Sequence, residues 1–257
     1  MIYTKVDIHV EHILYLIGAL AAGIIKGGFG IGAGILPVAF LSLFLPPDRV
    51  IVMLYPAMLM TTLFSLIPYW GKWDLSILKL FIPASLIGTW IGVSILALTP
   101  GNILRIVLGL LALTFVWNEW NRKRKKTTLP EDHIRPWWES GLAGIFGGMA
   151  SSLAHAGGMV FSMYLVRLGL TKERFVATLI IAFTISDIMK GFFYSQLDML
   201  QLVDLYTLIT TALAGLIGVV GGTWLQRSIS LERFQVVILG LISISGLILI
   251  GSVFNSL

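Results

Sequence analysis

Several side chains that could bind an anion or carry a proton lie inside strongly apolar stretches of this sequence. They are Lys26, Ser151, Ser152, His155, Asp187 and Lys190. A charged side chain at the centre of a bilayer costs about 3 kcal/mol or more and is normally retained for a purpose. Lys26 could attract an anion, or its ammonium could reach toward the membrane surface. His155 could donate to an anion or carry a proton, or it could be a neutral histidine bonded to the backbone.

Asp187 and Lys190 are two residues of opposite charge within one apolar stretch. They stand three residues apart, so on a helix their side chains can pair with each other. The spacing is compatible with a structural ion pair and equally with a role in ion coupling or gating. Both readings stay open at this point.

Residue patterns typical of catalysis do not occur in the chain. The four histidines, His9, His12, His133 and His155, form no HExxH pair, and there is no cysteine. No serine has a partner base at a suitable spacing, and no GxxxxGK[ST] phosphate-binding loop is found. We therefore expect no catalytic residue, no metal and no cofactor, and we do not expect an enzyme. An intramembrane enzyme and a membrane scaffold or assembly partner without transport activity stay as alternatives.

Two glycine-rich interruptions accompany these polar residues. The first is Gly27-Gly28-Phe29-Gly30-Ile31-Gly32-Ala33-Gly34. The second is Gly147-Gly148-Met149-Ala150-Ser151-Ser152, with Ala154-His155-Ala156-Gly157-Gly158 close behind. Each glycine costs a helix about 1 kcal/mol relative to alanine, so both runs predict a break in the helix. The alternative is that the glycines only allow tight helix packing, as expected for Gly88/Gly92 and Gly218/Gly222.

A helix that resumes near the centre of the bilayer starts with unpaired backbone N–H groups, which attract anions. We expect the chain to resume at about 33–45 and about 157–168, and the two starts to face a shared anion. The predicted substrate-binding residues are Lys26, Gly28, Gly30, Gly32, Ala33, Gly34, Ser151, Ser152, His155, Gly157 and Gly158. The predicted coupling or gating residues are Asp187 and Lys190.

The composition places these elements in a membrane. The chain is 57% hydrophobic and 12% charged, with a mean hydropathy of +0.91. Soluble domains carry about 25% charged residues, so a soluble form would expose large apolar patches. The net charge of +5 comes largely from the linker run Arg122–Lys126 and forms no basic face, so we do not expect nucleic-acid binding.

Hydropathy divides the chain into two similar halves that we expect to be all-α. The first membrane repeat covers 1–121, with a broken segment at about 12–45 and spans at about 50–70, 75–98 and 102–118. A basic cytoplasmic linker covers 122–136. The second repeat covers 137–257, with a broken segment at about 138–168 and spans at about 175–195, 202–225 and 232–254. Polar turns aligned at a constant offset indicate duplication.

The distribution of basic residues favours inverted repeats. If each broken segment is a hairpin, each half crosses the membrane three times, and eleven of fourteen Lys and Arg outside the spans share a side. If each broken segment crosses once, the halves are parallel and the split is eight to six. Cytoplasmic loops are enriched in Lys and Arg, so we favour inversion, a cytoplasmic linker and both termini on the other side. The N-terminal stretch is expected to be retained, and the protein to lie in the plasma (inner) membrane.

The glycine-rich stretches resemble those of the sulfite exporter TauE/SafE family. The resemblance rests on Gly27–Pro37 in the first half, and on Gly141–Gly148 followed by Ala156-Gly157-Gly158-Met159-Val160 in the second. Size, duplication and the basic linker extend it over nearly the whole chain. The family has a more glycine-dense run where this chain has Ala150-Ser151-Ser152-Leu153-Ala154-His155, which leaves the substrate less certain than the fold.

The resemblance implies a secondary transporter, and specifically an exporter, of a small sulfur-containing anion such as sulfite, a sulfonate or sulfoacetate. The anion would bind at the midplane, and the two halves would rock to expose it to either side. Proton or sodium coupling and assembly into a homo-oligomer are left open. The expected partners are the small anion and the lipid bilayer.

Overall fold

The computed structural model describes residues 8–29, 33–124, 137–228 and 231–254, and no strand occurs in these ranges. Each half has a short helix inside its broken segment and three long helices after it. The first half contains α1 (Ile8–Phe29), α2 (Ile35–Leu41), α3 (Pro47–Leu66), α4 (Leu75–Leu98) and α5 (Gly101–Arg124). The second contains α6 (Trp137–Ala154), α7 (Gly157–Val166), α8 (Lys172–Gln196), α9 (Leu205–Ser228) and α10 (Leu231–Phe254). Short 3-10 turns follow α3 at Ile67–Tyr69 and α8 at Met199–Leu202.

Seven helices of the described chain are long and apolar enough to cross a membrane. They are α1, α3, α4, α5, α8, α9 and α10. A bilayer core needs about 20 predominantly apolar residues per helix. Only helices and closed barrels satisfy the whole backbone in lipid, which agrees with the absence of strands from the described ranges. The predicted all-α, multi-pass membrane fold is confirmed.

Each broken segment folds back on itself as a helical hairpin. A Cβ atom on Gly18 of α1 would touch the Leu41 side chain at the end of α2, so α2 runs back along α1. In the second half, a Cβ on Gly157 would lie 2.7 Å from the Ser151 Cβ, and one on Gly147 would collide with the Phe161 ring. The chain therefore reverses its direction at each break.

The positions of the breaks differ from the prediction. Gly27 and Gly28 lie inside α1, and all of Gly147–Ser152 lies inside α6. The second interruption falls instead at His155 and Ala156. Gly148 is helical because α6 packs so closely on α4 there that an added Cβ would lie 2.7 Å from the Thr89 nitrogen. Glycine at this position serves close helix approach, which offsets its low helix propensity.

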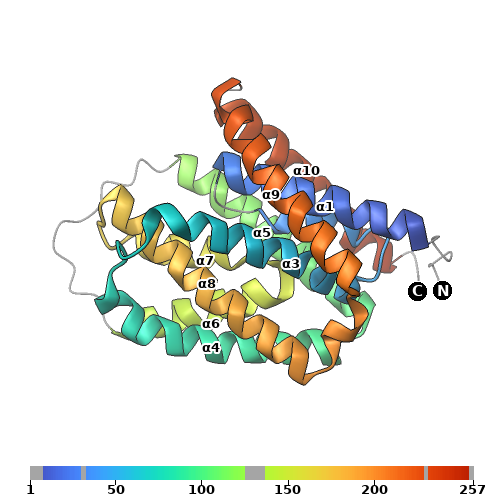
Figure 1. Cartoon of the computed structure of the whole chain (residues 1–257), viewed down its shortest axis with the longest axis horizontal. Coiled ribbons are helices and arrows are strands. Elements are labelled where there is room, and N and C mark those ends of the chain that lie inside the picture. The colour runs from blue at the N-terminus through green and yellow to red at the C-terminus, as the bar shows by residue number, and fades with distance from the viewer. Residues whose placement is uncertain (1–7, 30–32, 125–136, 229–230, 255–257) are drawn as a thin grey trace.

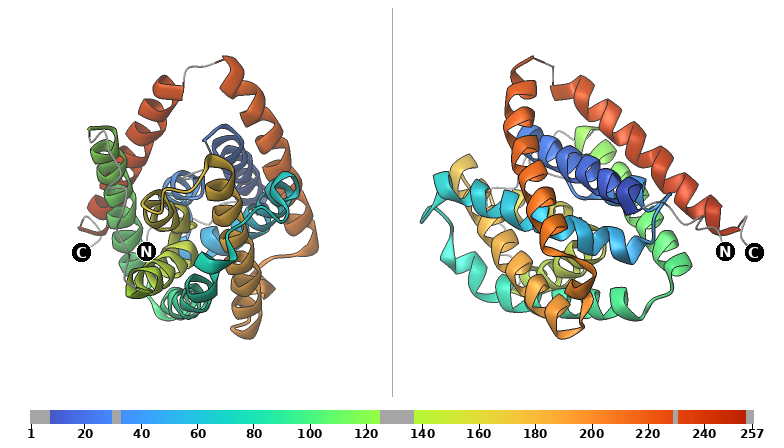
Figure 2. Two further views of the ribbon diagram at one scale, coloured as in Figure 1. Left: turned by 90° about the vertical axis from the view of Figure 1, so that its left-hand side faces the viewer. Right: turned by 45° about the vertical axis from the view of Figure 1, so that its right-hand side comes forward.

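Helices of opposite halves pack together through glycine (Figures 1 and 2). The α1 helix lies along α9, where a Cβ on Gly23 would be 2.9 Å from the Gly218 Cα. The α6 helix lies along α4, where a Cβ on Gly92 would be 2.9 Å from the Met149 Cα. The predicted packing role of Gly88/Gly92 and Gly218/Gly222 is confirmed. Each broken segment is thus held by the other half of the molecule.

Equivalent helices of the two halves run antiparallel where they touch. The end of α3 and the start of α8 line one cavity together, at Ser65 and Phe175. Nearer the start of α3, the Tyr55 hydroxyl donates to the Asp187 carbonyl of α8 at 3.0 Å. Antiparallel equivalents are what inverted halves require, and the inversion itself stays a prediction.

Single cysteines at Arg49 and Arg174 test the inversion, because these exposed residues hold equivalent positions at the starts of α3 and α8. The chain has no native cysteine, so each variant carries one thiol. We expect Arg49→Cys and Arg174→Cys to react with an impermeant thiol reagent from opposite sides of the membrane, with Arg174→Cys on the cytoplasmic side. Labelling of both from one side would rule out inverted halves.

Candidate functional site

Two polar helix faces meet in the middle of the molecule. On α8, Phe183, Asp187, Lys190 and Tyr194 follow one another at spacings of four, three and four residues, which places them on one side of the helix. On α3, the spacing of Ile51, Tyr55, Met58 and Thr62 does the same. Asp187 and Lys190 are only 3% and 1% exposed, so these charges are inside the protein and not on its lipid face.

The two helix breaks touch each other beside this face. A Cβ on Gly34, just before α2, would lie 2.8 Å from the carbonyl oxygen and 3.1 Å from the Cα of His155. His155 ends α6 with a left-handed backbone, at φ 49°. This conformation is uncommon for a residue other than glycine, and histidine is among the side chains that adopt it more often. Both interruptions therefore lie at one place in the fold.

Lys190 is held by three acceptors, the number that its ammonium can satisfy. Its Nζ is 2.7 Å from Asp187 Oδ1, 3.2 Å from the Ser151 carbonyl oxygen and 3.2 Å from His155 Nδ1. The predicted Asp187–Lys190 pair is confirmed. Because a buried charge needs a partner and further hydrogen bonds to offset its desolvation, this arrangement keeps Lys190 charged.

The tautomer of His155 follows from its neighbours. Its Nε2 lies 3.0 Å from the carbonyl oxygen of Ile51, which can only accept, so Nε2 carries the proton. Its Nδ1 then accepts from the Lys190 ammonium. His155 is therefore a neutral ring that links α3 to α8 through the second helix break.

Lys26 of α1 reaches the same face but has no carboxylate among its hydrogen-bond partners. Its Nζ donates to the Met58 carbonyl at 3.3 Å, to the Thr61 hydroxyl at 3.1 Å and to the Thr62 hydroxyl. Thr62 in turn lies 3.0 Å from Asp187 Oδ2, so a single hydroxyl separates Lys26 from the carboxylate. Lys26 is also partly exposed, unlike Lys190.

The charges of this cluster do not cancel. Lys26 and Lys190 contribute two ammonium groups, Asp187 contributes one carboxylate, and His155 is neutral. With Lys26 protonated, the described cluster therefore has an excess of one positive charge inside the protein. Buried charges are normally paired, so the arrangement favours one further negative charge.

A small cavity opens onto the cluster, and we call it the central cavity. It has a volume of about 40 Å³ and is lined by Lys26, Ala33, Gly34, Met58, Thr62, Ser151, His155, Gly158, Phe183, Asp187 and Lys190. A water molecule needs roughly 10–15 Å³ measured this way, so only a few non-hydrogen atoms fit. Its lining draws on both breaks and on α1, α3 and α8.

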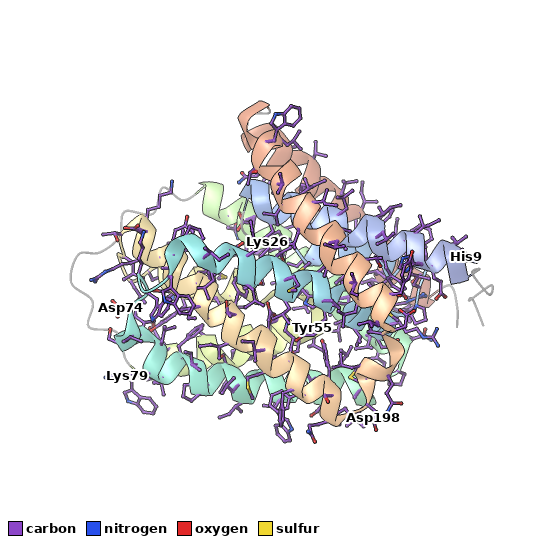
Figure 3. The ribbon with its side chains drawn as sticks, viewed as in Figure 1. His9, Lys26, Tyr55, Asp74, Lys79 and Asp198 are labelled. Atoms are coloured by element: carbon purple, nitrogen blue, oxygen red, sulfur yellow. The ribbon has the colours of Figure 1, made fainter. Side chains whose placement is uncertain are left out.

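A larger cavity, the vestibule, lies next to it on one side. It has a volume of about 700 Å³, and its lining includes Ser65 and Ile67 near the end of α3 and Phe175 near the start of α8. The vestibule and the central cavity share the lining residues Lys26, Thr62 and Phe183. Figure 3 places Asp74 and Lys79 at this end of the molecule, His9 and Asp198 at the other, and Lys26 and Tyr55 between them.

The vestibule end carries charged residues that tie α4 to α8. Lys72 pairs with Glu173 at 2.7 Å, and Arg174 lies 3.8 Å from Asp74. Asp74 also begins α4 by accepting the Ser76 N–H at 3.0 Å. The Ser76 hydroxyl also donates to the Asp74 carboxylate. The hydrogen bonds from the Ser76 hydroxyl and N–H, more than the nearby Arg174, hold the pKa of Asp74 below its usual value. Two pairs of opposite charge thus lie at the vestibule end, which is the predicted cytoplasmic side.

Two tyrosines close the opposite side of the central cavity. Tyr55 lies one turn before Met58 on α3, and Tyr194 lies one turn after Lys190 on α8. They are 7% and 0% exposed, and their ring centroids are 5.4 Å apart in an edge-to-face contact. The Tyr194 hydroxyl also lies 3.4 Å from the Ser152 carbonyl oxygen. The structure therefore has a route toward the vestibule end and a packed aromatic barrier toward the other end.

Phe183 stands between the vestibule and the central cavity, where its ring packs over the start of α7. A Cβ on Gly158 would lie 2.7 Å from the ring, whose centroid is 5.3 Å from that of Phe161. We expect an anionic methanethiosulfonate to modify Ser151→Cys slowly, and roughly tenfold faster once Phe183→Ala removes ring contacts of about 1 kcal/mol. Ser65→Cys in the vestibule is the control and should react equally in both backgrounds. Equal rates at Ser151→Cys would show that the ring is no barrier.

The structure brings together most of the predicted site residues. The central cavity is lined by Lys26, Ala33, Gly34, Ser151, His155, Gly158, Asp187 and Lys190. Three others have packing contacts instead. Gly28 faces the Gly222 carbonyl of α9, Gly157 packs within its hairpin against Ser151, and the Ser152 hydroxyl donates to the Thr89 carbonyl at 3.1 Å. Gly28 also lines the vestibule. Gly30 and Gly32 lie outside the described residues.

Sequence reasoning missed the contributions of α3. Thr61 and Thr62 form the hydroxyl shell of Lys26, and Tyr55 and Phe183 bound the cavity on its two sides. A signal was available, because Thr61-Thr62 is a polar pair inside an otherwise apolar span. The helical spacing of Phe183, Asp187 and Lys190 was a second one.

Comparison with known protein families gives a match. The family described as "Sulfite exporter TauE/SafE" matches residues 15–249, which include every residue that lines the central cavity. No curated protein and no solved structure gives a significant match.

Proposed function

This chain belongs to the sulfite exporter TauE/SafE family, a family of membrane transporters, and on that premise we propose that it moves a small sulfur-containing monoanion across the membrane. The anion binds in the central cavity, in contact with Lys26 and close to the Asp187–Lys190 pair. Hydrogensulfite has the required charge and only four non-hydrogen atoms. The protein performs no bond-making step on it.

The excess positive charge of the buried cluster is the observation that carries this proposal. Two ammonium groups face one carboxylate, and Lys26 has only neutral hydrogen-bond partners. A monoanion beside Lys26 would bring the cluster to neutrality and replace weaker hydrogen bonds by charge-assisted ones. Gly158, in the first turn of α7, lines the central cavity, so the N–H groups at the start of this helix add positive potential there.

The fold supports alternating access to this cavity. The vestibule adjoins the central cavity at the predicted cytoplasmic end, with Phe183 between the two, while Tyr55 and Tyr194 close the other end. Each broken segment packs on a helix of the other half, so movement of one half carries a part of the other half's hairpin with it. We infer that the vestibule faces the cytoplasm and that the tyrosine pair separates in the outward-open state.

Flux through purified protein in liposomes tests the proposal. We expect vesicles with the protein to exchange radiolabelled sulfite with external sulfite faster than protein-free vesicles, and with saturation. A scaffold or assembly partner would leave sulfite flux at the protein-free rate. That outcome, with correctly inserted protein, would contradict transport.

A further inference from the structure

We propose that Lys26 binds one proton together with each transported anion and releases both together, so that anion and proton cross the membrane in the same direction. This inference rests on the transport of a small monoanion proposed above. It adds the coupling ion, and it assigns the proton to a named side chain.

The loss of the anion leaves the charges around the central cavity unbalanced. When the anion leaves, Lys26 and Lys190 face Asp187 alone, and the cluster keeps one unbalanced charge inside the protein. A transport cycle has to move this empty cavity from one side to the other. An unpaired buried ammonium is unfavourable, and a buried group with this cost tends to lose its charge by losing its proton.

The hydroxyl groups that bond to Lys26 suit both of its protonation states. Thr61 and Thr62 are hydroxyl groups, which accept from an ammonium and can turn to donate to a neutral amine. The partners of Lys190 cannot do this in the same way. The Asp187 carboxylate and the Ser151 carbonyl can only accept hydrogen bonds, so they suit the ammonium form of Lys190 alone.

Lys26, unlike Lys190, lies on the path between the two cavities. Lys190 is 1% exposed and does not line the vestibule, whereas Lys26 is partly exposed and lines both cavities. The proton can therefore reach Lys26 along the route that the anion takes. The titratable groups that face Lys26 are Asp187 and Lys190 from α8, His155 from the second break, and Tyr69 at the vestibule. The residues of α3 and α9 that line the cavities beside it are uncharged.

One proton per anion keeps the cluster neutral both when it is loaded and when it is empty. The anion brings one negative charge, Lys26 takes up one proton from water on the same side, and the loaded cluster is neutral. On release the N–H bond of Lys26 breaks, the proton returns to water, and the empty cluster is again neutral. Flux should therefore depend on the pH difference across the membrane and be insensitive to the membrane potential.

The test compares the native protein with Lys26→Arg, since arginine keeps the charge and cannot lose its proton. Sulfite is titrated into each purified protein in two buffers of different ionisation enthalpy, which gives the protons taken up per anion bound. The anion's own protonation contributes equally to both. We expect the native protein to take up about one proton more than Lys26→Arg. Equal uptake would overturn the coupling while leaving anion binding intact, and absence of sulfite binding to the native protein would remove the proposed function as well.

A second measurement decides the case if Lys26→Arg fails to bind sulfite. Native protein in liposomes is given equal sulfite and equal pH on both sides, and a potassium diffusion potential is set across the membrane with valinomycin. Exchange of sulfite without net accumulation supports the coupling, because an anion that moves with one proton carries no net charge. Accumulation of sulfite on the positive side overturns it.

Discussion

Lys26→Gln is expected to weaken sulfite binding by roughly 30- to 1,000-fold and to stop transport. The substitution removes the one ammonium of the cluster whose hydrogen-bond partners are all uncharged. Loss of a partner to a buried charge costs about 2–4 kcal/mol, which corresponds to that range. Calorimetric titration and exchange of labelled sulfite measure the two effects.

Lys79→Gln is the matched control. Lys79 is an exposed lysine on α4 at the vestibule end, so this substitution removes the same charge from the chain without touching the cavity. It should leave sulfite affinity within about twofold of the native value, because exposed charges are well screened. If both variants lost sulfite binding equally, the effect would come from overall charge and not from the central cavity.

Lys190→Met is expected to lower the free energy of unfolding by about 3–5 kcal/mol, since it leaves the Asp187 carboxylate buried without its cation. The two side chains are 2.7 Å apart and only 1% and 4% exposed. Adding Asp187→Asn should recover most of that stability, because the double variant buries no charge. Unfolding in detergent micelles, monitored by tryptophan fluorescence, measures both.

Comparison of the double variant with Lys190→Met separates the effect of the buried carboxylate from the effect of packing. A double variant as unstable as Lys190→Met alone would mean that packing of the lysine stem, and not the buried carboxylate, determines the loss. Restored stability without restored sulfite transport would show that the ion pair serves the cavity beyond holding the fold.

Much of the fold follows from local sequence features. Apolar length marks the spans, and the glycine runs mark the two segments that turn back. Asp187 and Lys190 were recognised as a pair because three residues on one helix bring two side chains together. Each of these inferences needs only neighbours along the chain.

The position of the second helix break and the partners of Lys26 depend on packing between segments that are distant in the sequence. Gly148 is helical where α4 approaches it, and Gly147 is helical where it faces the Phe161 ring of α7. The break moves on to His155, where the left-handed backbone meets Gly34 of the other half. The shell around Lys26 comes from Thr61 and Thr62, which lie 35 and 36 residues further along the chain. Helical spacing shows which face a residue occupies, but it does not show which helix that face meets.

Calorimetric titration of sulfite into the purified native protein tests the central claim most directly. We expect saturable binding of one anion per chain, because the cluster with Lys26 protonated has one unbalanced positive charge, and loss of that binding in Lys26→Gln. Binding of equal affinity in the native protein and Lys26→Gln would contradict it, as would the absence of any saturable binding to folded native protein.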